Sequence, residues 1–128
     1  MMKRSIVVII IILALVISGG FLQNRKIKSI NKNSVEKLES ISLSLDVGSY
    51  NEAKDKFQTY EKYWVKSKKL LTLIISHDEL DAITNHNSRL NAYLNERGVL
   101  DAYAEIGELT DIYSELEEKF RLSLRNIL

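Results

Sequence analysis

Hydrophobic residues are distributed in two different ways along the chain. Residues 5–22 carry no charge, and twelve consecutive apolar residues run from Ile6 to Ile17. Beyond this run, apolar residues recur every three or four positions, which is the period of one face of an α-helix. As a helix, the uncharged run spans roughly 27 Å, close to the thickness of the hydrocarbon core of a bilayer. The first pattern therefore predicts a membrane-spanning helix, and the second predicts amphipathic helices.

The amino-terminal segment, residues 1–24, permits two interpretations. A Lys-Arg pair precedes the apolar run, as it does in both signal-anchors and cleaved signal peptides. Only Val16 and Ser18 offer a weak cleavage pattern, so we favour an uncleaved anchor. A short positive amino terminus normally stays in the cytoplasm. This predicts a single-pass protein of the cell membrane, with residues 25–128 outside the cytoplasm.

The periodic apolar positions predict four helices. We expect one long helix over residues 4–46, two helices that begin after Ser49 and Ser76, and a fourth over about residues 100–118. The closing stretch RLSLRNIL either extends the fourth helix or packs as a tail. The predicted core-facing positions, in chain order, are Ile27, Ile30, Ser34, Leu38, Ile41, Leu45, Tyr50, Ala53, Phe57, Tyr60, Trp64, Ser67, Leu71, Leu80, Ile83, Asn87, Leu90, Leu94, Ala102, Ile106, Leu109, Tyr113, Leu116 and Phe120.

Glycines and Ser-x-x-Glu patterns mark the boundaries of these helices. Gly48 is suited to the left-handed conformation that ends a helix, and Gly98 is expected to end the third helix. Two Ser-x-x-Glu capping boxes are predicted to begin the second and third helices, at Ser49 and Ser76. Between them, the stretch KKLLTLII at residues 68–75 is apolar nearly all round. We expect it to be a helix end buried on several sides rather than a patch that dips into the membrane.

The two halves of the helical region resemble each other. A constant offset of 49 residues relates Ala53, Phe57, Tyr60 and Trp64 to Ala102, Ile106, Leu109 and Tyr113. Each half then forms a helix, a glycine-containing turn and a second helix, as in tetratricopeptide-like hairpin repeats. We predict an all-α fold of two domains. A transmembrane anchor over residues 1–24 continues into a small antiparallel four-helix bundle over residues 25–128.

Composition and charge narrow the possible functions. The chain has 128 residues, no proline and no cysteine, which favours helices and excludes disulfides and thiolate chemistry. The net charge of +1 conceals a gradient from +6 over residues 1–32 to −9 over residues 70–118. Nucleic-acid binding requires a concentrated basic face, which this distribution does not provide. We therefore expect no nucleic-acid partner, and a lipid bilayer as the partner of residues 5–22.

The stretch IISHDELDAI, residues 74–83, is the main candidate for chemistry. His77 and Asp81 lie about one helical turn apart and could hold a divalent cation weakly. A structural zinc site normally has four protein ligands, however, and a serine followed by acids is typical of a helix start. The second histidine, His86, falls on roughly the opposite face. Since the sequence also lacks a phosphate loop and a nucleophile elbow, we expect no cofactor, no catalytic residue and no enzymatic activity.

A row of acids on the fourth helix is a candidate for protein binding. The acids recur at helical spacing, at Asp101, Glu105, Glu108, Asp111 and Glu115. They form either a solvated face or a docking face for a basic partner. The Lys66, Lys68 and Lys69 cluster of a second copy of the chain would be such a partner.

An aromatic row on the second helix is a candidate for ligand binding. The row consists of Tyr50, Phe57, Tyr60 and Trp64. It forms either the core of the bundle or the lining of a ligand groove, and a small bundle needs its aromatic side chains inside.

The chain also resembles a known family of membrane proteins. The stretches MKRSIVVIIIILALVISGG, YNEAKDKFQTYEKYW, SHDELDAI, LNAYL and LRNIL, in this order and spacing, are similar to the domain-of-unknown-function family 4363. That family comprises single-pass, membrane-anchored helical proteins of spore-forming Gram-positive bacteria and has no established activity. The resemblance implies no catalytic residue, and it implies a multi-pass membrane protein as a partner.

These patterns together predict a non-enzymatic, membrane-anchored, extracytoplasmic helical domain. Its expected role is that of an interaction or accessory subunit of a membrane-protein complex, with a multi-pass membrane protein or a second copy of the chain as partner. The expected interaction residues are Asp101, Glu105, Glu108 and Glu115. The alternative is a sensory or ligand-binding four-helix module. A cavity lined by Tyr50, Phe57 and Trp64 would favour that alternative, whereas a filled core would favour the interaction domain.

Overall fold

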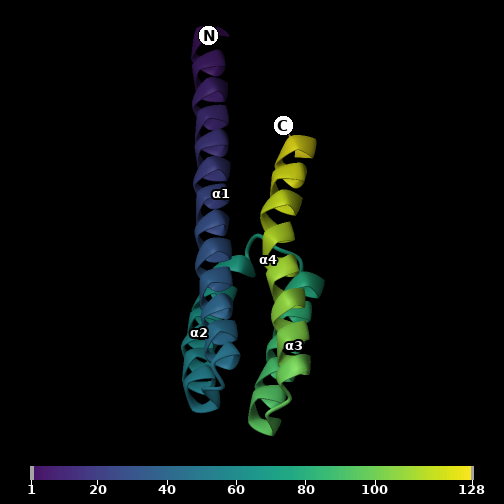
Figure 1. Cartoon of the computed structure of the whole chain (residues 1–128). Coiled ribbons are helices and arrows are strands. Elements are labelled where there is room, and N and C mark those ends of the chain that lie inside the picture. Colours follow the sequence, from purple (N-terminus) through teal and green to yellow (C-terminus); the bar gives the residue numbers. More distant parts are fainter. Residues whose placement is uncertain (1, 128) are drawn as a thin grey trace.

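Helices account for nearly the whole chain. The computed structural model describes the backbone of residues 2–127 and the side chains of residues 3–122 and 125. Within this range there is no strand (Figure 1), and the four helices are α1 (Met2–Asp46), α2 (Tyr50–Leu71), α3 (His77–Glu96) and α4 (Val99–Ile127). The predicted all-α fold is confirmed. The helix that continues from the apolar run into the bundle and the helical extension through the closing stretch are confirmed as well.

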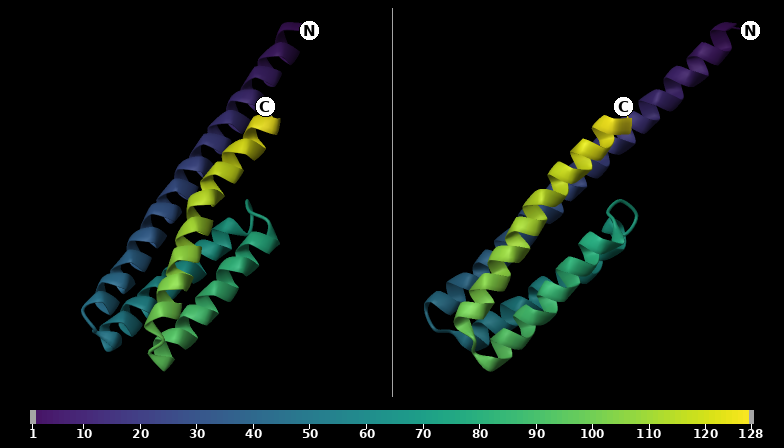
Figure 2. Two further views of the ribbon diagram at one scale, coloured as in Figure 1. Left: turned by 45° about the vertical axis from the view of Figure 1, so that its right-hand side comes forward. Right: turned by 90° about the vertical axis from the view of Figure 1, so that its right-hand side faces the viewer.

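The helices form a bundle of two antiparallel hairpins. α1 packs against both α2 and α4, and α3 packs against α4, whereas α2 and α3 are the adjacent helices that contact each other least. Figures 1 and 2 show the hairpin of α1 and α2 beside the hairpin of α3 and α4. The loosest side of the bundle therefore lies between α2 and α3.

The predicted core-facing positions form the core. All of them are buried except Tyr50, which is half-buried at the start of α2. Trp64 and Tyr60 each meet the Tyr113 ring edge-on, with ring centroids 6.2 Å and 6.4 Å apart. The aromatic row of α2 is therefore filled core around Phe57 and Tyr60, and only its outer edge reaches a groove, which is described below.

The amino-terminal half of α1 extends well beyond the bundle (Figure 2). Its most apolar window has a mean hydropathy of 3.0, and none of that window is buried. Each large apolar side chain from Ile6 to Ile17 is more than half exposed, for example 58% for Ile10. Among the described residues, α1 is the one helix long and apolar enough to cross a membrane, although a signal sequence meets the same test.

One predicted helix end is shifted by one residue. Gly48 has a φ of 74°, as predicted, whereas at the end of α3 the residue with a positive φ is Arg97, at 58°, one position before the glycine that was predicted to end that helix. The Gly98 amide donates to the Tyr93 carbonyl at 2.8 Å, and the Arg97 guanidinium lies 5.3 Å from the centre of the Tyr50 ring. This contact with α2 helps to offset the roughly 1–2 kcal/mol that a left-handed non-glycine residue costs.

The predicted capping boxes are wrong in their hydrogen bonds. Ser49 and Ser76 do occupy the residue before each helix, but neither side chain makes a capping hydrogen bond. The glutamates that would complete the boxes bind lysines instead. Glu52 pairs with a lysine one turn along α2 at 3.3 Å, and Glu79 Oε1 lies 2.9 Å from Lys119 Nζ on α4. The hydrogen bond that the Lys119 ammonium donates to Glu79 also raises the pKa of Lys119.

The stretch at residues 68–75 is less buried than predicted. Leu71 ends α2 and is buried, but Leu73 in the following turn is 84% exposed. Ile74 and Ile75 turn back and pack against the core. The prediction is wrong because a short turn between two antiparallel helices can direct only some of its side chains inward.

Candidate functional site

A buried polar cluster occupies the middle of the core. The Tyr60 hydroxyl donates to Asn87 Oδ1 at 2.7 Å and lies 2.7 Å from the Tyr113 hydroxyl. Because a phenol has a single hydrogen, Tyr113 must be the donor in the second bond. Tyr60 and Tyr113 are fully buried and Asn87 is 5% exposed, so the cluster joins α2, α3 and α4 away from water.

Burial raises the pKa of both tyrosines. For Tyr60, loss of contact with water is the largest cause, and the adjacent Tyr113 raises its pKa further. For Tyr113, burial again raises the pKa, although the hydrogen bond with Tyr60 opposes the shift. Both phenols therefore stay neutral near neutral pH, and they hold the helices together rather than exchange protons.

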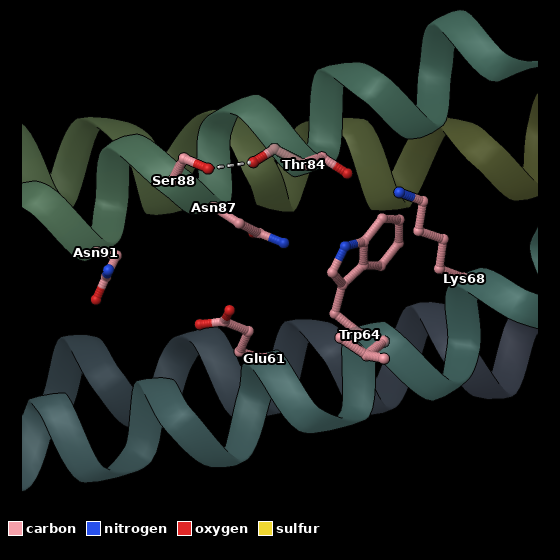
Figure 3. A pocket seen from close by; sticks show the side chains of 8 residues that line it. Glu61, Trp64, Lys68, Thr84, Asn87, Ser88 and Asn91 are labelled. Carbon is pink, nitrogen blue, oxygen red and sulfur yellow. Dashed lines mark hydrogen bonds between the residues drawn. The ribbon is translucent and has the colours of Figure 1, made fainter.

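A groove opens beside this cluster, on the loose side of the bundle between α2 and α3. It has a volume of about 380 Å³ and is lined by Glu61, Trp64, Val65, Lys68, Thr84, Asn87, Ser88 and Asn91. Figure 3 shows the Asn87 amide reaching from α3 into the space beside the Trp64 indole. Asn87 Nδ2 is buried and has no hydrogen-bond partner. The groove therefore contains a hydrogen-bond donor that has no partner within the described part of the protein.

The groove has polar and aromatic groups of the kind that bind small ligands. Glu61 and Lys68 bring opposite charges from α2, and Asn87 offers an amide donor between them. A small ligand with an acceptor group could satisfy that donor, with its apolar part against the Trp64 indole. Within the lining residues, no nucleophile is paired with a base.

The predicted cation candidates lie elsewhere and are exposed. His77 is the first residue of α3, and Asp81 follows one turn later on the same helix. Among the described residues, no group of three or more histidine, aspartate and glutamate side chains is placed to hold a metal ion. The structure leaves this pair as two solvated side chains at the start of a helix.

The structure divides the predicted row of acids on α4 into two groups. Glu105 turns toward α3, where its carboxylate lies 2.6 Å from His86 Nδ1 and 3.2 Å from Arg89 Nε. Asp101, Glu108 and Glu115 are exposed. Their docking role stays a prediction, and Glu105 is already engaged within the chain.

The sequence pattern did not predict the features that the loose side of the bundle, between α2 and α3, brings together. Asn87 interrupts an otherwise apolar face, and such an interruption is a usable sign of a buried polar contact. The pairing of Glu105 with His86 and Arg89 depends on the rotation of α4 against α3, which the sequence pattern alone does not define. The groove likewise depends on how closely α2 approaches α3.

The fold and the site define a class of protein, an all-α bundle of two hairpins whose first helix extends as an exposed apolar segment. The chain belongs to the family described as Domain of unknown function (DUF4363), whose model matches residues 21–127. No curated protein and no solved structure matches this chain. The resemblance found in the sequence is therefore confirmed, while the family itself assigns no activity.

Proposed function

We propose that the protein is a non-enzymatic, single-pass membrane protein whose helical bundle lies outside the cytoplasm. We further propose that the bundle acts as an interaction or accessory subunit of a membrane-protein complex. The observation that carries the proposal is that the bundle buries no residue of the apolar window of α1. Each large apolar side chain that stays in water lacks the roughly 1.5–3 kcal/mol of stabilisation that burial provides. A bilayer supplies the missing apolar surroundings.

The continuity of α1 favours an anchor that is retained. The helix runs unbroken from the exposed segment to Ile27 and Ile30, which are buried in the bundle. A continuous helix transmits the position and rotation of its membrane segment to the domain that it enters. A cleaved signal peptide needs no such continuity.

The exposed acids of α4 support a role in protein interaction. Asp101, Glu108 and Glu115 recur every seven residues and therefore form one stripe along the helix. Such a stripe complements a basic surface, on a multi-pass membrane protein or on a second copy of this chain. A photocrosslinking residue at Glu108 should give a specific product in native membranes. The same residue at Lys62, exposed on α2, is the matched control.

Cysteine accessibility in intact cells tests the orientation and the anchor. The chain has no cysteine, so Lys3→Cys and Ser88→Cys each introduce a single thiol, and both positions are exposed. In intact protoplasts an impermeant maleimide should label Ser88→Cys, and it should label Lys3→Cys only after lysis. The reverse pattern would contradict the orientation. A mature protein whose amino terminus lies after Ser18 would contradict the retained anchor.

A second candidate function, ligand binding in a sensory module, is favoured by the groove. The unpartnered Asn87 donor and the Trp64 edge support it, although Tyr50 and Phe57 do not line the groove. A panel of amino acids and small carboxylates can be titrated while the fluorescence of the single tryptophan is followed. Saturable binding that Asn87→Leu abolishes would raise this function above the first.

A further inference from the structure

We propose that the turn between α2 and α3 docks on the surface of the bilayer, with Leu73 entering the interface and neighbouring lysines contacting anionic headgroups. This inference rests on the proposed membrane anchor. It adds a second contact between the bundle and the membrane, and this contact would fix the tilt of the bundle over the bilayer.

The length of α2 places the turn at the level where α1 leaves the bundle. α2 has 22 residues and spans roughly 33 Å, the same rise as an equal number of residues in α1. Since the two helices pack antiparallel from the turn at Gly48, the end of α2 lies beside about residue 25 of α1, just past the uncharged run. Figures 1 and 2 show this turn at the end of the bundle from which α1 continues toward the amino terminus.

The backbone of the turn holds Leu73 outward. The Leu73 amide donates to the Leu70 carbonyl at 3.2 Å, and the Ile74 and Ile75 amides donate to the Leu71 carbonyl at 2.9 Å and 2.7 Å. Ile74 and Ile75 pack against the core, whereas Leu73 is 84% exposed and Leu70 is 40% exposed. A single exposed leucine is ordinary in a soluble protein. Here it lies on a hydrogen-bonded turn at the membrane end of the bundle.

The charges beside Leu73 match an anionic membrane surface. Lys68 and Lys69 lie in the last turn of α2. Lys69 is exposed, Lys68 is half-buried at the edge of the groove, and no ion pair engages either of them in the described part of the chain. Lysines near a membrane surface attract anionic headgroups, and their long stems let the ammonium group stay in water while the apolar part is buried.

The last turns of α4 pass the level of the α2–α3 turn and continue further along α1 (Figure 2). Lys28 Nζ lies 3.6 Å from Glu117 Oε1, which aligns the two antiparallel helices at this point. Residues of α4 beyond Glu117 therefore run beside the part of α1 that precedes Lys28, and Arg121, Leu122 and Arg125 there are exposed. The α2–α3 turn and the end of α4 thus both lie beside the helix that would enter the bilayer.

Site-specific fluorescence in the full chain tests the docking. Leu73 and Leu100 are both 84% exposed, but Leu73 lies in the turn between α2 and α3, whereas Leu100 is the second residue of α4, at the opposite end of the bundle. Each is replaced by cysteine in the cysteine-free chain, labelled with the environment-sensitive fluorophore NBD, and reconstituted in phosphatidylcholine vesicles with or without phosphatidylglycerol. Lipids with a nitroxide near the headgroup end of the acyl chain serve as quenchers. NBD at Leu73→Cys should be blue-shifted and quenched, and NBD at Leu100→Cys should be neither.

The lysines and the anchor provide the controls. Lys68→Gln and Lys69→Gln should each lower the docking equilibrium about fivefold, in vesicles that contain phosphatidylglycerol. Equal, unquenched signals at Leu73 and Leu100, with NBD at Ile10→Cys quenched, would overturn the docking and leave the anchor intact. A blue shift at Leu73 without lipid quenching would indicate burial against a second copy and would also overturn it. An unquenched label at Ile10 would overturn the anchor itself.

Discussion

The two halves of α1 have the same backbone and opposite surroundings. The apolar window in the first half has no buried residue, although its mean hydropathy is 3.0. The second half, from Ile27 onward, buries one stripe of side chains and exposes the rest. Leu38 is fully buried and Ile10 is 58% exposed on the same continuous helix.

The difference shows that periodicity, rather than hydrophobicity alone, indicates which surroundings a helix requires. A stripe every three or four residues requires one apolar neighbour and leaves the other faces to water. A run that is apolar all round requires apolar surroundings on every side. The bundle provides the apolar neighbour that the second half of α1 requires. Nothing within the described residues provides apolar surroundings for the first half.

Truncating one side chain in each half of α1 should give the largest difference in unfolding free energy. Leu38→Ala should cost about 2–5 kcal/mol of unfolding free energy, because it opens a cavity in the core. Ile10→Ala removes a side chain that the described part of the bundle does not bury, so the bundle should unfold as in the wild type. Urea unfolding of the full chain in lipid nanodiscs, followed by Trp64 fluorescence, measures both. A comparable loss in the two variants would contradict the separation of the two halves.

A smaller effect is expected from the polar cluster that joins α2, α3 and α4 in the core, against which the second half of α1 packs only as part of the bundle. Tyr60→Phe should cost about 1–3 kcal/mol, because it leaves both Asn87 and Tyr113 without their buried partner. Tyr103→Phe is the matched control, since its hydroxyl bonds to Asp46 at an exposed position. The same urea unfolding compares the two variants. An equal cost for both would mean that the core cluster contributes no more than a surface contact.

The smallest effect is expected at the start of α3. Ser76→Ala should change stability by only a few tenths of a kcal/mol, because the hydroxyl makes no capping bond, whereas a working cap contributes about 1 kcal/mol. Glu79→Gln should cost more than Ser76→Ala, since it weakens the contact with Lys119 across to α4. Thermal unfolding of the two variants measures which substitution costs more stability. A loss of about 1 kcal/mol of stability in Ser76→Ala would contradict this prediction and show that the capping box does form.

The sequence predicted the fold almost completely, for a physical reason. Helical faces are a local property, and the spacing of apolar residues identified nearly every buried position from Ile27 to Phe120. The predictions were wrong where the backbone or a side chain had more than one possible local arrangement. α3 ends at Glu96 with Arg97 in the left-handed conformation, one residue before Gly98, and Glu79 binds Lys119 rather than its own helix start.

The candidate site was much harder to predict, because it depends on distances between helices. Asn87 could be placed on the inner face of α3, but its bond to Tyr60 and its unpartnered nitrogen depend on the separation of α2 and α3. The exposure of Leu73 likewise follows from the path of one short turn. No periodic pattern encodes either feature.

The measurement that tests the central claim most directly compares two positions on α1 of equal exposure. Ile10 and Leu43 are each 58% exposed, the first in the apolar half and the second in the bundle half. A spin label at each cysteine variant, in the full chain reconstituted in vesicles, reports its access to oxygen and to a water-soluble nickel complex. We predict high oxygen and low nickel access at Ile10, and the reverse at Leu43. Nickel access at Ile10 equal to that at Leu43 would contradict the account, because it would place the apolar half of α1 in water.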